Sequence, residues 1–519
     1  MFRSFKQIKR LLSLGRLLAR HDALFALQLA GVSPVLLKLA AFGVHADSTG
    51  RPGERLARAL NEAGPSFIKL GQALSTRSDI LGEDLTEDLS SLQDNLPPFA
   101  TIEAKRAIED ELGAPVEDLF LEFDDTPIAA ASIAQVHFAI THDGRKVAVK
   151  VLRPGIEAAF RRDLDLFRWI AEIAEQTQPQ LMRLKPLESI ETLADTVEME
   201  MDLRFEAAAA AELRENFAND PDFKVPEVDW QLTAKRVLTT ERLIDGIPLD
   251  DKDAIVAAGL DPVEILTKAA SASFRQVFRD GFFHADTHPG NMFVLPDGRI
   301  AVVDFGIMGR IDLKNRRAIA EMLVAFLNRN YRRAAEVHFE AGWVPRDRSV
   351  DNFTQACRSI AEPILDKPQN EISIARLLAQ LFQITETFRM ETQPQLLLLQ
   401  KTMLVAEGTA RKLAPDANMW FLIRPLIEDW MIVNLGPEAK IRDAVHTVQD
   451  TLERLPEMIS SVERGSKMLA EGNFKLHPDT IRALRGEDGS PRKRASSQAV
   501  GVWLITLVFL IIFVAVILD

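Results

Sequence analysis

The sequence predicts an α+β fold with two lobes, preceded by a helical N-terminal extension and followed by a C-terminal transmembrane helix. Three observations lead to this prediction. A β-rich stretch carries a lysine at position 150, a mainly helical half begins near residue 241, and the chain ends in an uncharged apolar run. A chain of 519 residues is also too long for one ordinary core, so several structural units are expected.

The composition excludes several classes of protein. Hydrophobic residues make up 47% of the chain and charged residues 26%, which is typical of a folded protein. The net charge of −13 argues against general nucleic-acid binding, because no global basic field recruits phosphates. Cys357 is the one cysteine, so disulfides and multi-cysteine zinc sites are excluded.

Residues 1–105 are predicted to form the helical extension, since apolar residues recur at three- and four-residue spacing up to the break at Pro97 and Pro98. The first twenty residues hold six basic residues and no acidic one, with Phe5, Ile8 and Leu12 at helical spacing. Such a helix either lies on an anionic membrane or is an ordinary surface helix, and the sequence leaves both interpretations open.

Residues 106–240 are predicted to form the small lobe. "TIEAKRAIEDELG" indicates a helix that is capped by Thr101 and ends at Gly113. Two β-rich runs joined by "HDG" predict a hairpin. A long helical stretch follows from about Glu157 to Asn216, and "VPEVDWQLTAKRVLTTERLIDG" returns to strands.

Residues 241–440 are predicted to form a mainly helical large lobe, interrupted by the short hairpin pattern "MFVLPDGRIAVV". Residues 441–498 are expected to be amphipathic helices and a polar linker. Residues 499–518, "AVGVWLITLVFLIIFVAVIL", carry no charge and as a helix would span roughly 30 Å. The basic cluster Arg492–Arg494 predicts that the preceding side is cytoplasmic.

The stretch "GFFHADTHPGNMFV" carries polar residues at an informative spacing. Asp286 precedes Asn291 by five residues, Asp304 follows in "VVDFG", and Lys150 lies in "KVAVKV". The catalytic loop, metal-binding aspartate and phosphate-binding lysine of protein kinases have this order. Alternatively, these polar residues could simply hydrogen-bond to one another in a corner of a large globular fold. The occurrence of all four residues in the kinase order favours a nucleotide-phosphate site on a protein-kinase-like bilobal fold.

Phosphoryl transfer suggests a role for each of these residues. Asp304 would hold Mg²⁺ between the phosphates of ATP, and Asn291 would offer a neutral oxygen to a second metal ion. Asp286 would accept or orient the proton of the attacking group, and Lys150 would bind the phosphates. His284 and His288 are expected to be structural, and a zinc pair is not favoured because carboxylates suit magnesium better.

The loop before Lys150 departs from the usual glycine-rich pattern and reads "AAAS". We expect Ala129, Ala130, Ala131 and Ser132 to face the phosphates, although alanine restricts the positive φ that glycine allows. Alternatively, these small residues could only allow close packing of a strand, without a role in phosphate binding. The strand "RVLTTERLIDG" is expected to supply the hinge, with backbone groups near Glu241 and Leu243 meeting the adenine edge.

Six motifs together resemble the UbiB/ABC1/ADCK family of atypical protein-kinase-like proteins. They are "KLGQ" at 69–72, "AAAS" at 129–132, "VAVK" ending at Lys150, "EMDLRFEA" at 200–207, "HADTHPGN" at 284–291 and "DFG" at 304–306. The resemblance covers about residues 60 to 310.

The resemblance implies further site residues. Glu206 would pair with Lys150, and Glu200 and Asp202 would form the family's E-x-D signature. Lys69 and Gln72 would form its K-x-G-Q signature, on an extension that folds over the active site. Taken by themselves, Lys69 and Gln72 would be an ordinary polar face on an exposed helix.

The resemblance also implies a place and a pathway. Bacterial UbiB members are membrane-bound and support ubiquinone biosynthesis. We therefore expect a protein of the inner membrane with its catalytic body on the cytoplasmic side. The expected partners are membrane lipids, polyprenyl-phenol ubiquinone precursors and other enzymes of the pathway; a homodimer stays open.

A protein substrate is disfavoured by the sequence itself. No A-P-E segment follows Asp304, and a helix is expected within about ten residues, which leaves little room for a peptide-docking segment. A lipid or small-molecule acceptor, or ATP hydrolysis coupled to lipid handling, fits better.

Two other functions compete with a kinase or ATPase. A ring hydroxylase would need a flavin or iron site, and neither a G-x-G-x-x-G β–α turn nor a two-histidine, one-carboxylate set is found. A non-catalytic scaffold that binds nucleotide and organises pathway enzymes stays open.

Overall fold

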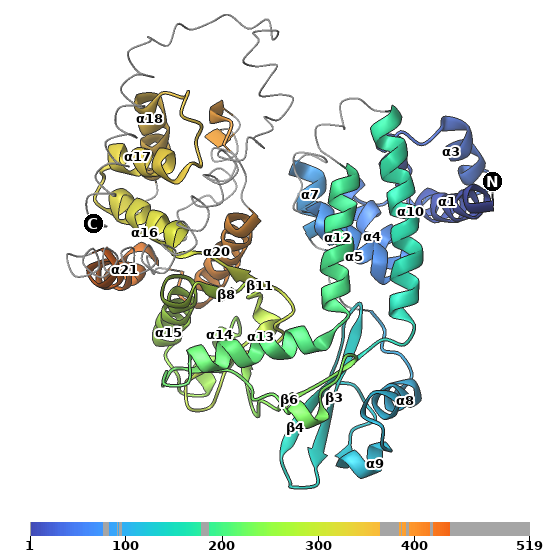
Figure 1. Ribbon diagram of the computed structural model, residues 1–519, viewed down its shortest axis with the longest axis horizontal. Helices are drawn as coiled ribbons and strands as arrows, with labels where there is room; N and C mark the ends of the chain where they lie inside the picture. Colours follow the sequence, from blue (N-terminus) through green and yellow to red (C-terminus); the bar gives the residue numbers. More distant parts are fainter. Residues whose placement is uncertain are drawn as a thin grey trace, which may run out of the picture. The chain divides into compact units, whose positions relative to one another are not determined.

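The computed structural model describes residues 2–75, 83–90, 92, 96–177, 186–363, 384–385, 387–390, 394–415 and 419–435 (Figure 1). Contacts divide the chain into one unit at Met1–Gly436 and another at Pro437–Asp519. The predicted tail and transmembrane helix lie outside the described residues. Within the described ranges, no helix combines the length and apolar character needed to cross a membrane.

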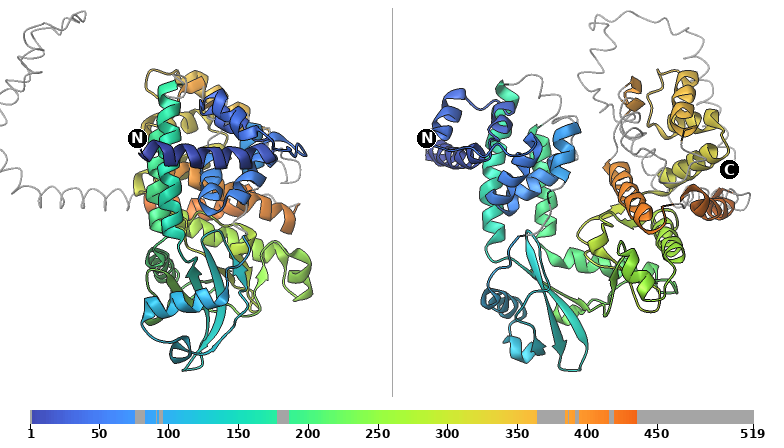
Figure 2. Two further views of the ribbon diagram at one scale, coloured as in Figure 1. Left: turned by 90° about the vertical axis from the view of Figure 1, so that its right-hand side faces the viewer. Right: turned by 180° about the vertical axis from the view of Figure 1, so that it is seen from behind.

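The N-terminal extension is helical, in agreement with the spacing of its apolar residues. Its buried face joins α10 and α12 in one core that includes Leu11, Leu60 and Phe167. The views in Figure 2 show these blue helices beside the teal and green helices α10 and α12. The helices are α1 (Phe2–Arg20), α2 (Phe25–Leu29), α3 (Pro34–Ala41), α4 (Pro52–Ala63), α5 (Pro65–Ser75) and α7 (Glu83–Ser90).

A five-stranded antiparallel sheet forms the small lobe, and the predicted hairpin is its centre. Strands β3 and β4 pair from Ala134↔Leu152 to Ile140↔Lys146, and Gly144 in their turn has φ +83°. The order is β1–β3–β4–β6, with β2 paired to β3. The elements are α8 (Thr101–Leu112), α9 (Val116–Leu119), β1 (Phe120–Phe123), β2 (Ala129–Ala130), β3 (Ala134–Thr141), β4 (Lys146–Leu152) and β6 (Val237–Glu241).

Successive side chains of β4 lie on opposite faces of the small-lobe sheet. Val147, Val149 and Val151 are buried in a core shared with α8. Successive side chains of a strand point to opposite faces, so Lys150 points away from that core. This period-two pattern places Lys150, like Lys146 at the start of the strand, on the face opposite the three valines.

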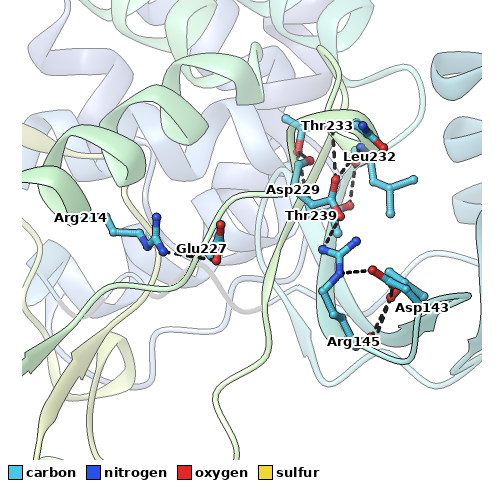
Figure 3. Close-up of polar contacts among 10 residues, drawn as sticks. Asp143, Arg145, Arg214, Glu227, Asp229, Leu232, Thr233 and Thr239 are labelled. Carbon is cyan, nitrogen blue, oxygen red and sulfur yellow. Dashed lines mark hydrogen bonds and ion pairs between the residues drawn. The ribbon is translucent and has the colours of Figure 1, made fainter. Parts of the chain in front are cut away.

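The end of the hairpin is tied to the segment before β6 by polar contacts (Figure 3). Arg145 donates to Asp143 at 2.6 Å and to Asp229 at 2.7 Å. Asp229 also caps the short 3₁₀ helix η1 (Trp230–Leu232), and Thr239 of β6 donates to Leu232 O at 2.7 Å. These bonds fasten the segment before β6 to the hairpin turn and to β6, while β6 itself pairs with β4 from Val147↔Glu241 to Val151↔Val237.

The helix at 101–112 corrects one expectation. Its N-cap is Ala100, not Thr101, and the Thr101 hydroxyl donates to Asp125 O instead, at 2.7 Å. The hydroxyl therefore links the helix to the loop after β1 rather than capping the helix itself. The expected end is confirmed, since Gly113 is the C-cap in the left-handed region.

The long helical stretch from Glu157 to Asn216 is divided among separate helices. They are α10 (Ile156–Thr177), α12 (Pro186–Glu200) and α13 (Leu203–Asn216). Asp202 lies in extended conformation between the last two and accepts the Arg204 N–H at 3.1 Å. An aspartate N-cap satisfies an otherwise unpaired backbone donor, so it starts a new helix here.

The large lobe contains short strands among many helices. One sheet has the order β5–β10–β9–β7, and β8 pairs with β11. The strands are β5 (Phe223–Lys224), β7 (Ile247–Pro248), β8 (Phe282–His284), β9 (Met292–Val294), β10 (Ile300–Val302) and β11 (Met308–Arg310). The helices are α14 (Lys252–Ala257), α15 (Pro262–Phe274), the π-helical η2 (Arg275–Asp280), η3 (Pro289–Asn291), α16 (Leu313–Leu327), α17 (Tyr331–Ala341), α18 (Val350–Ala361), α20 (Pro394–Leu413) and α21 (Met419–Leu435).

One hydrophobic core joins the two lobes. It includes Ala134 and Leu152 of the small-lobe sheet, Ala207 of α13, and Met292 and Val302 of the large lobe. Because α13 contributes to this shared core, its buried face is held against both lobes. This arrangement places the side chains discussed next where the lobes meet.

Candidate active site

Lys150 lies between two carboxylates from different parts of the chain. Its Nζ is 2.8 Å and 3.0 Å from the two carboxylate oxygens of Glu206, and 3.1 Å from Oδ1 of Asp304. Glu206 occupies the buried face of α13, four residues before Ala210. A carboxylate at such an apolar position is stable only when it is paired and hydrogen-bonded. The pair that the resemblance implied is therefore formed.

Burial and charge act against each other on these three groups. Burial raises the pKa of Glu206, with Lys150 opposing that change and Asp304 reinforcing it. Burial alone would lower the pKa of Lys150, but the two carboxylates hold it above its usual value. Partial burial would raise the pKa of Asp304, but the Lys150 ammonium holds it below its usual range. One ammonium thus faces two carboxylates, which leaves an excess of negative charge.

Asp304 has an unusual backbone conformation directly after β10. Its φ is +62°, a region that residues other than glycine seldom adopt. Its side chain remains 47% exposed while it contacts Lys150. The Gly306 N–H also donates to Asp304 Oδ1, at 3.4 Å. Uncommon backbone conformations of this kind concentrate at functional sites, where the surrounding structure maintains them.

His284 connects the two aspartates from a position that is 1% exposed. Its Nε2 lies 2.8 Å from Asp304 O, and its Nδ1 accepts the Asp286 N–H at 3.1 Å. These partners require a proton on Nε2 and a lone pair on Nδ1, so the ring is neutral. Burial lowers the pKa of His284, which agrees with a neutral ring. These contacts agree with the structural role expected of this histidine, which remains a prediction.

The side-chain amide of Asn291 is hydrogen-bonded to the main chain of Asp286 in the catalytic loop. Asn291 Nδ2 donates to Asp286 O at 3.1 Å, and Val303 N–H donates to Asn291 O at 2.9 Å. Because the amide nitrogen is used in this way, Asn291 Oδ1 is the atom that can face a cation. His288 caps η3, where its Nδ1 accepts the Gly290 N–H at 3.1 Å.

One residue of this site has no motif that reveals it. Gln276, buried in the π-helical η2, accepts the His284 N–H through its Oε1 at 2.9 Å. A π-helical turn is rare and is frequently found next to functional sites. Nothing in the local sequence distinguishes this glutamine from one on an ordinary helix, so only the structure assigns it to the loop.

The alanine-rich loop becomes more buried along its length. Ala129 is exposed, Ala130 and Ala131 are half-buried, and Ser132 is fully buried. Ala131 N–H donates to Ala134 O at 2.7 Å, which closes the turn into β3. The Ser132 hydroxyl has no hydrogen-bond partner among the described residues. Contact of this loop with phosphates remains a prediction.

The expected hinge residues lie where the chain leaves the small lobe. Glu241 ends β6, its carboxylate pairs with Lys224 at 2.7 Å, and its N–H donates to Glu227 O at 2.7 Å. Leu243 follows, half-buried, in the connection to β7. The Glu241 N–H already has a partner, so the groups that could contact the adenine edge are the Glu241 carbonyl and backbone groups near Leu243. This adenine contact remains a prediction.

Lys69 is not part of an exposed polar face. Its Nζ lies 2.9 Å from Glu200 Oε2, and both side chains are only 12% exposed. Gln72 lies one turn further along α5 and is half-buried. Glu200 is the last residue of α12, and Asp202 caps the helix that carries Glu206. The extension is therefore coupled through Glu200 to the start of α13, while Asp202 bonds Arg204.

The two-lobed fold and this set of residues define a protein-kinase-like protein that lacks the usual glycine-rich loop. Residues 91–338 match the family model described as the ABC1 atypical kinase-like domain, and residues 357–418 match the UbiB helical domain. The chain belongs to the UbiB family of atypical kinase-like proteins.

Relatives of this chain cover most of its length. It is 45% identical to "Probable protein kinase UbiB" of Marinobacter nauticus over 78% of this chain and 75% of the relative. It is 41% identical to the protein of that name from Aeromonas salmonicida, over 88% and 85%. Among solved structures, the Rv3197–erythromycin complex from Mycobacterium tuberculosis matches with a TM-score of 0.51 and 28% identity, over 71% of this chain and 93% of that one.

The strand that follows the D-F-G segment depends on a glycine. A Cβ on Gly309 of β11 would lie 2.2 Å from the ring of Phe283, which is buried in β8. We expect Gly309→Ala to destabilise the protein by about 1–3 kcal/mol through overpacking. Thermal unfolding followed by fluorimetry measures this. Gly408→Ala is the matched control, because nothing lies within 4 Å of its Cβ. Equal stability of the two variants would contradict the expectation.

Proposed function

We propose that this protein is a membrane-tethered, Mg-nucleotide-dependent atypical kinase or ATPase that supports ubiquinone biosynthesis. The observation that carries the proposal is the Lys150 ammonium bound by both Glu206 and Asp304, beside Asp286 and Asn291. A lysine paired to a helix glutamate, together with a D-F-G aspartate, is the arrangement that binds nucleotide phosphates in kinases.

The residues present fit magnesium. The available donors are the carboxylate of Asp304 and Oδ1 of Asn291, oxygen ligands of the kind that Mg²⁺ prefers. The excess negative charge around Lys150 favours a divalent cation as well. No group of three or more His, Cys, Asp and Glu side chains in the described ranges could hold a metal. Such a group is not required, because Mg²⁺ in nucleotide sites uses one or two protein ligands and the phosphates.

The protein residues would then divide the work of phosphoryl transfer. Bound magnesium would neutralise charge on the phosphates. Lys150 would bind the phosphates, with its direction set by Glu206. Asp286, placed by the His284 and Asn291 hydrogen bonds, would orient the attacking group and take its proton. The neutral His284 would keep the two aspartates in place rather than transfer protons.

A lipid or small-molecule acceptor fits the chain that follows Asp304. Helix α16 begins at Leu313, and β11 occupies Met308–Arg310 in between. This connection is already used by a strand and a helix cap, so it offers no extended segment on which a peptide could dock. With relatives named UbiB, a polyprenyl-phenol precursor is the acceptor class that we propose, with water as the alternative.

Phosphate release by the full-length protein tests the proposal. We expect turnover of ATP that requires Mg²⁺ and rises when anionic vesicles contain a polyprenyl-phenol-like lipid. Analysis of the extracted lipid for a phosphoryl ester distinguishes a kinase from an ATPase. If the protein neither bound nucleotide nor showed Mg-dependent turnover in any of these conditions, the proposal of an enzyme would be refuted. Flavin absorbance in the purified protein would support the ring hydroxylase instead.

The membrane tether is a separate prediction. The uncharged run at 499–518 is the expected anchor. Deletion of Ala499–Asp519 should move most of the protein from the membrane pellet to the supernatant after a carbonate wash. Deletion of the same number of residues from the segment 441–498 before it is the control. Full retention of the truncated protein would show that another segment anchors it.

A further inference from the structure

Helix α3 exposes an apolar strip. Val35 is 66% exposed, Leu39 54% and Phe42, which caps the helix, 85%. They recur at helical spacing, and Leu29 of α2 is exposed as well. Single exposed apolar residues are normal, but a contiguous group of large ones marks an interaction surface.

The neighbouring helix α1 does not offer its own apolar stripe. Leu11 and Leu18 are buried in the core shared with α10, and Gly15 packs so closely that a Cβ there would lie 2.7 Å from Ala40 Cβ. The structure therefore buries Leu11 and Leu18 in the protein interior, whereas Ile8 and Leu12, which the sequence suggested for membrane contact, are half-buried. Among residues 7–20 of α1, the exposed side chains are those of Lys9, Ser13, Arg16 and Arg20, three of which are cationic.

A groove lies between α1 and the segment that follows Phe42. It has a volume of about 810 Å³ and is lined by Lys9, Arg16 and Arg20 on one side and by Gly43, Val44 and His45 on the other. Arg20 pairs with Glu62 at 2.8 Å. Lys9 and Arg16 form no ion pair with any residue that the structure describes. The groove thus joins two available cations to the end of the apolar strip.

We propose that the strip and the groove form a docking surface for an anionic lipid bilayer. Val35, Leu39 and Phe42 would enter the boundary of the acyl chains, and Lys9 and Arg16 would meet headgroup phosphates. Charge supports this occupant: residues 1–45 hold seven Lys and Arg and one acidic residue, in a chain with a net charge of −13. A second copy of the same basic surface would bring like charges together.

This inference rests on the proposed membrane location but not on the proposed chemistry. It assigns a second, peripheral contact besides the C-terminal anchor. Deletion of the anchor and disruption of this surface therefore give separate results, and neither depends on phosphate release.

The test places a nitrobenzoxadiazole probe on the surface of the full-length protein, with the buried Cys357 replaced by alanine. Leu39→Cys carries the probe in one sample, and Ile102→Cys, on the exposed face of α8, carries it in the control. Both are reconstituted in vesicles of phosphatidylethanolamine and phosphatidylglycerol whose lipids are brominated near the headgroup. We expect the probe at position 39 to lose roughly half of its emission, and the probe at position 102 to stay bright.

Charge reversal provides the second arm. Lys9→Glu with Arg16→Glu should reduce the quenching at position 39 severalfold, as should replacement of the anionic lipid by phosphatidylcholine. Arg106→Glu, on the exposed face of α8, should leave the quenching unchanged. An unfolding temperature equal to that of the parent protein shows that the variants are folded. Equal quenching at both positions, quenching unaffected by charge reversal, or concentration-dependent shielding of position 39 in detergent would each overturn the proposal; the last would indicate a second copy as the occupant.

Discussion

Asp304→Asn should abolish the stabilisation of this protein by Mg-nucleotide, whereas Asp286→Asn should keep most of it, with turnover lost in both variants. Asp304 is the proposed metal ligand, so its neutral replacement weakens binding of the metal–nucleotide complex itself. Asp286 is proposed to act on the attacking group, so its loss lowers turnover by roughly 10²–10⁴-fold with little effect on binding.

The structure explains why the two substitutions should be tolerated. The hydrogen bonds that join Asp286 to His284 and Asn291 use its main-chain N–H and C=O, which asparagine retains. Lys150 keeps both Glu206 contacts when Asp304 is changed. The Asp286 carboxylate also lies 3.9 Å from His288 Nε2. Equal unfolding temperatures of variant and parent without nucleotide would show that a changed nucleotide response reflects the lost charge rather than a disordered site.

Thermal unfolding with and without Mg-ATP measures the binding arm. At a ligand concentration one hundred times the dissociation constant, linkage contributes about 2.7 kcal/mol, a shift of several degrees. Asp351→Asn is the control, because this exposed aspartate pairs only at the surface with Arg332. If Asp286→Asn supported ubiquinone production as well as the parent protein does, the catalytic proposal would fail and a nucleotide-binding scaffold would replace it.

The second large effect is expected where the extension meets the kinase-like lobes. Lys69→Ala should leave Glu200 mostly buried without its ion pair, which destabilises the protein by about 1–3 kcal/mol. Because Glu200 ends α12 just before the cap of α13, the change should also reach Glu206 and Lys150. We therefore expect weaker nucleotide-dependent stabilisation and lower turnover, despite the sequence distance between residues 69 and 150.

A double-mutant cycle isolates the pair. Lys69→Met and Glu200→Gln, alone and together, should show a coupling free energy of about 1 kcal/mol or more. The control is Arg168–Glu191, which joins α10 to the same helix α12 through two bonds of 2.8 Å but is more exposed. Its coupling should lie at about 0.2–1 kcal/mol, with turnover unchanged. If Lys69→Ala left the nucleotide-dependent stabilisation and turnover unchanged, the ion pair would only attach the extension to α12 and would have no effect on the nucleotide site.

Much of the local architecture follows from the sequence because the relevant signals are short-range. The β3–β4 hairpin follows from two apolar alternations around a glycine turn, and the order of Lys150, Asp286, Asn291 and Asp304 follows from motif spacing. The end of α8 at Gly113 is also local, since a glycine there adopts the left-handed conformation. The start of that helix was less determined, because Thr101 had a competing partner in Asp125, on another element.

The class of this protein, with two kinase-like lobes and a helical extension, was therefore predictable from sequence patterns, and its motifs indicated the family. Which charges meet could not be predicted in this way. Lys69 and Glu200, like Lys150 and Asp304, are separated by more than a hundred residues and are brought together by packing. The tertiary structure also places Gln276 against the catalytic loop, and it buries Leu11 and Leu18 of α1 while Val35 and Leu39 of α3 are exposed. The local sequence pattern predicts which face of a helix is apolar, but the elements that cover this face depend on the packing of the whole chain.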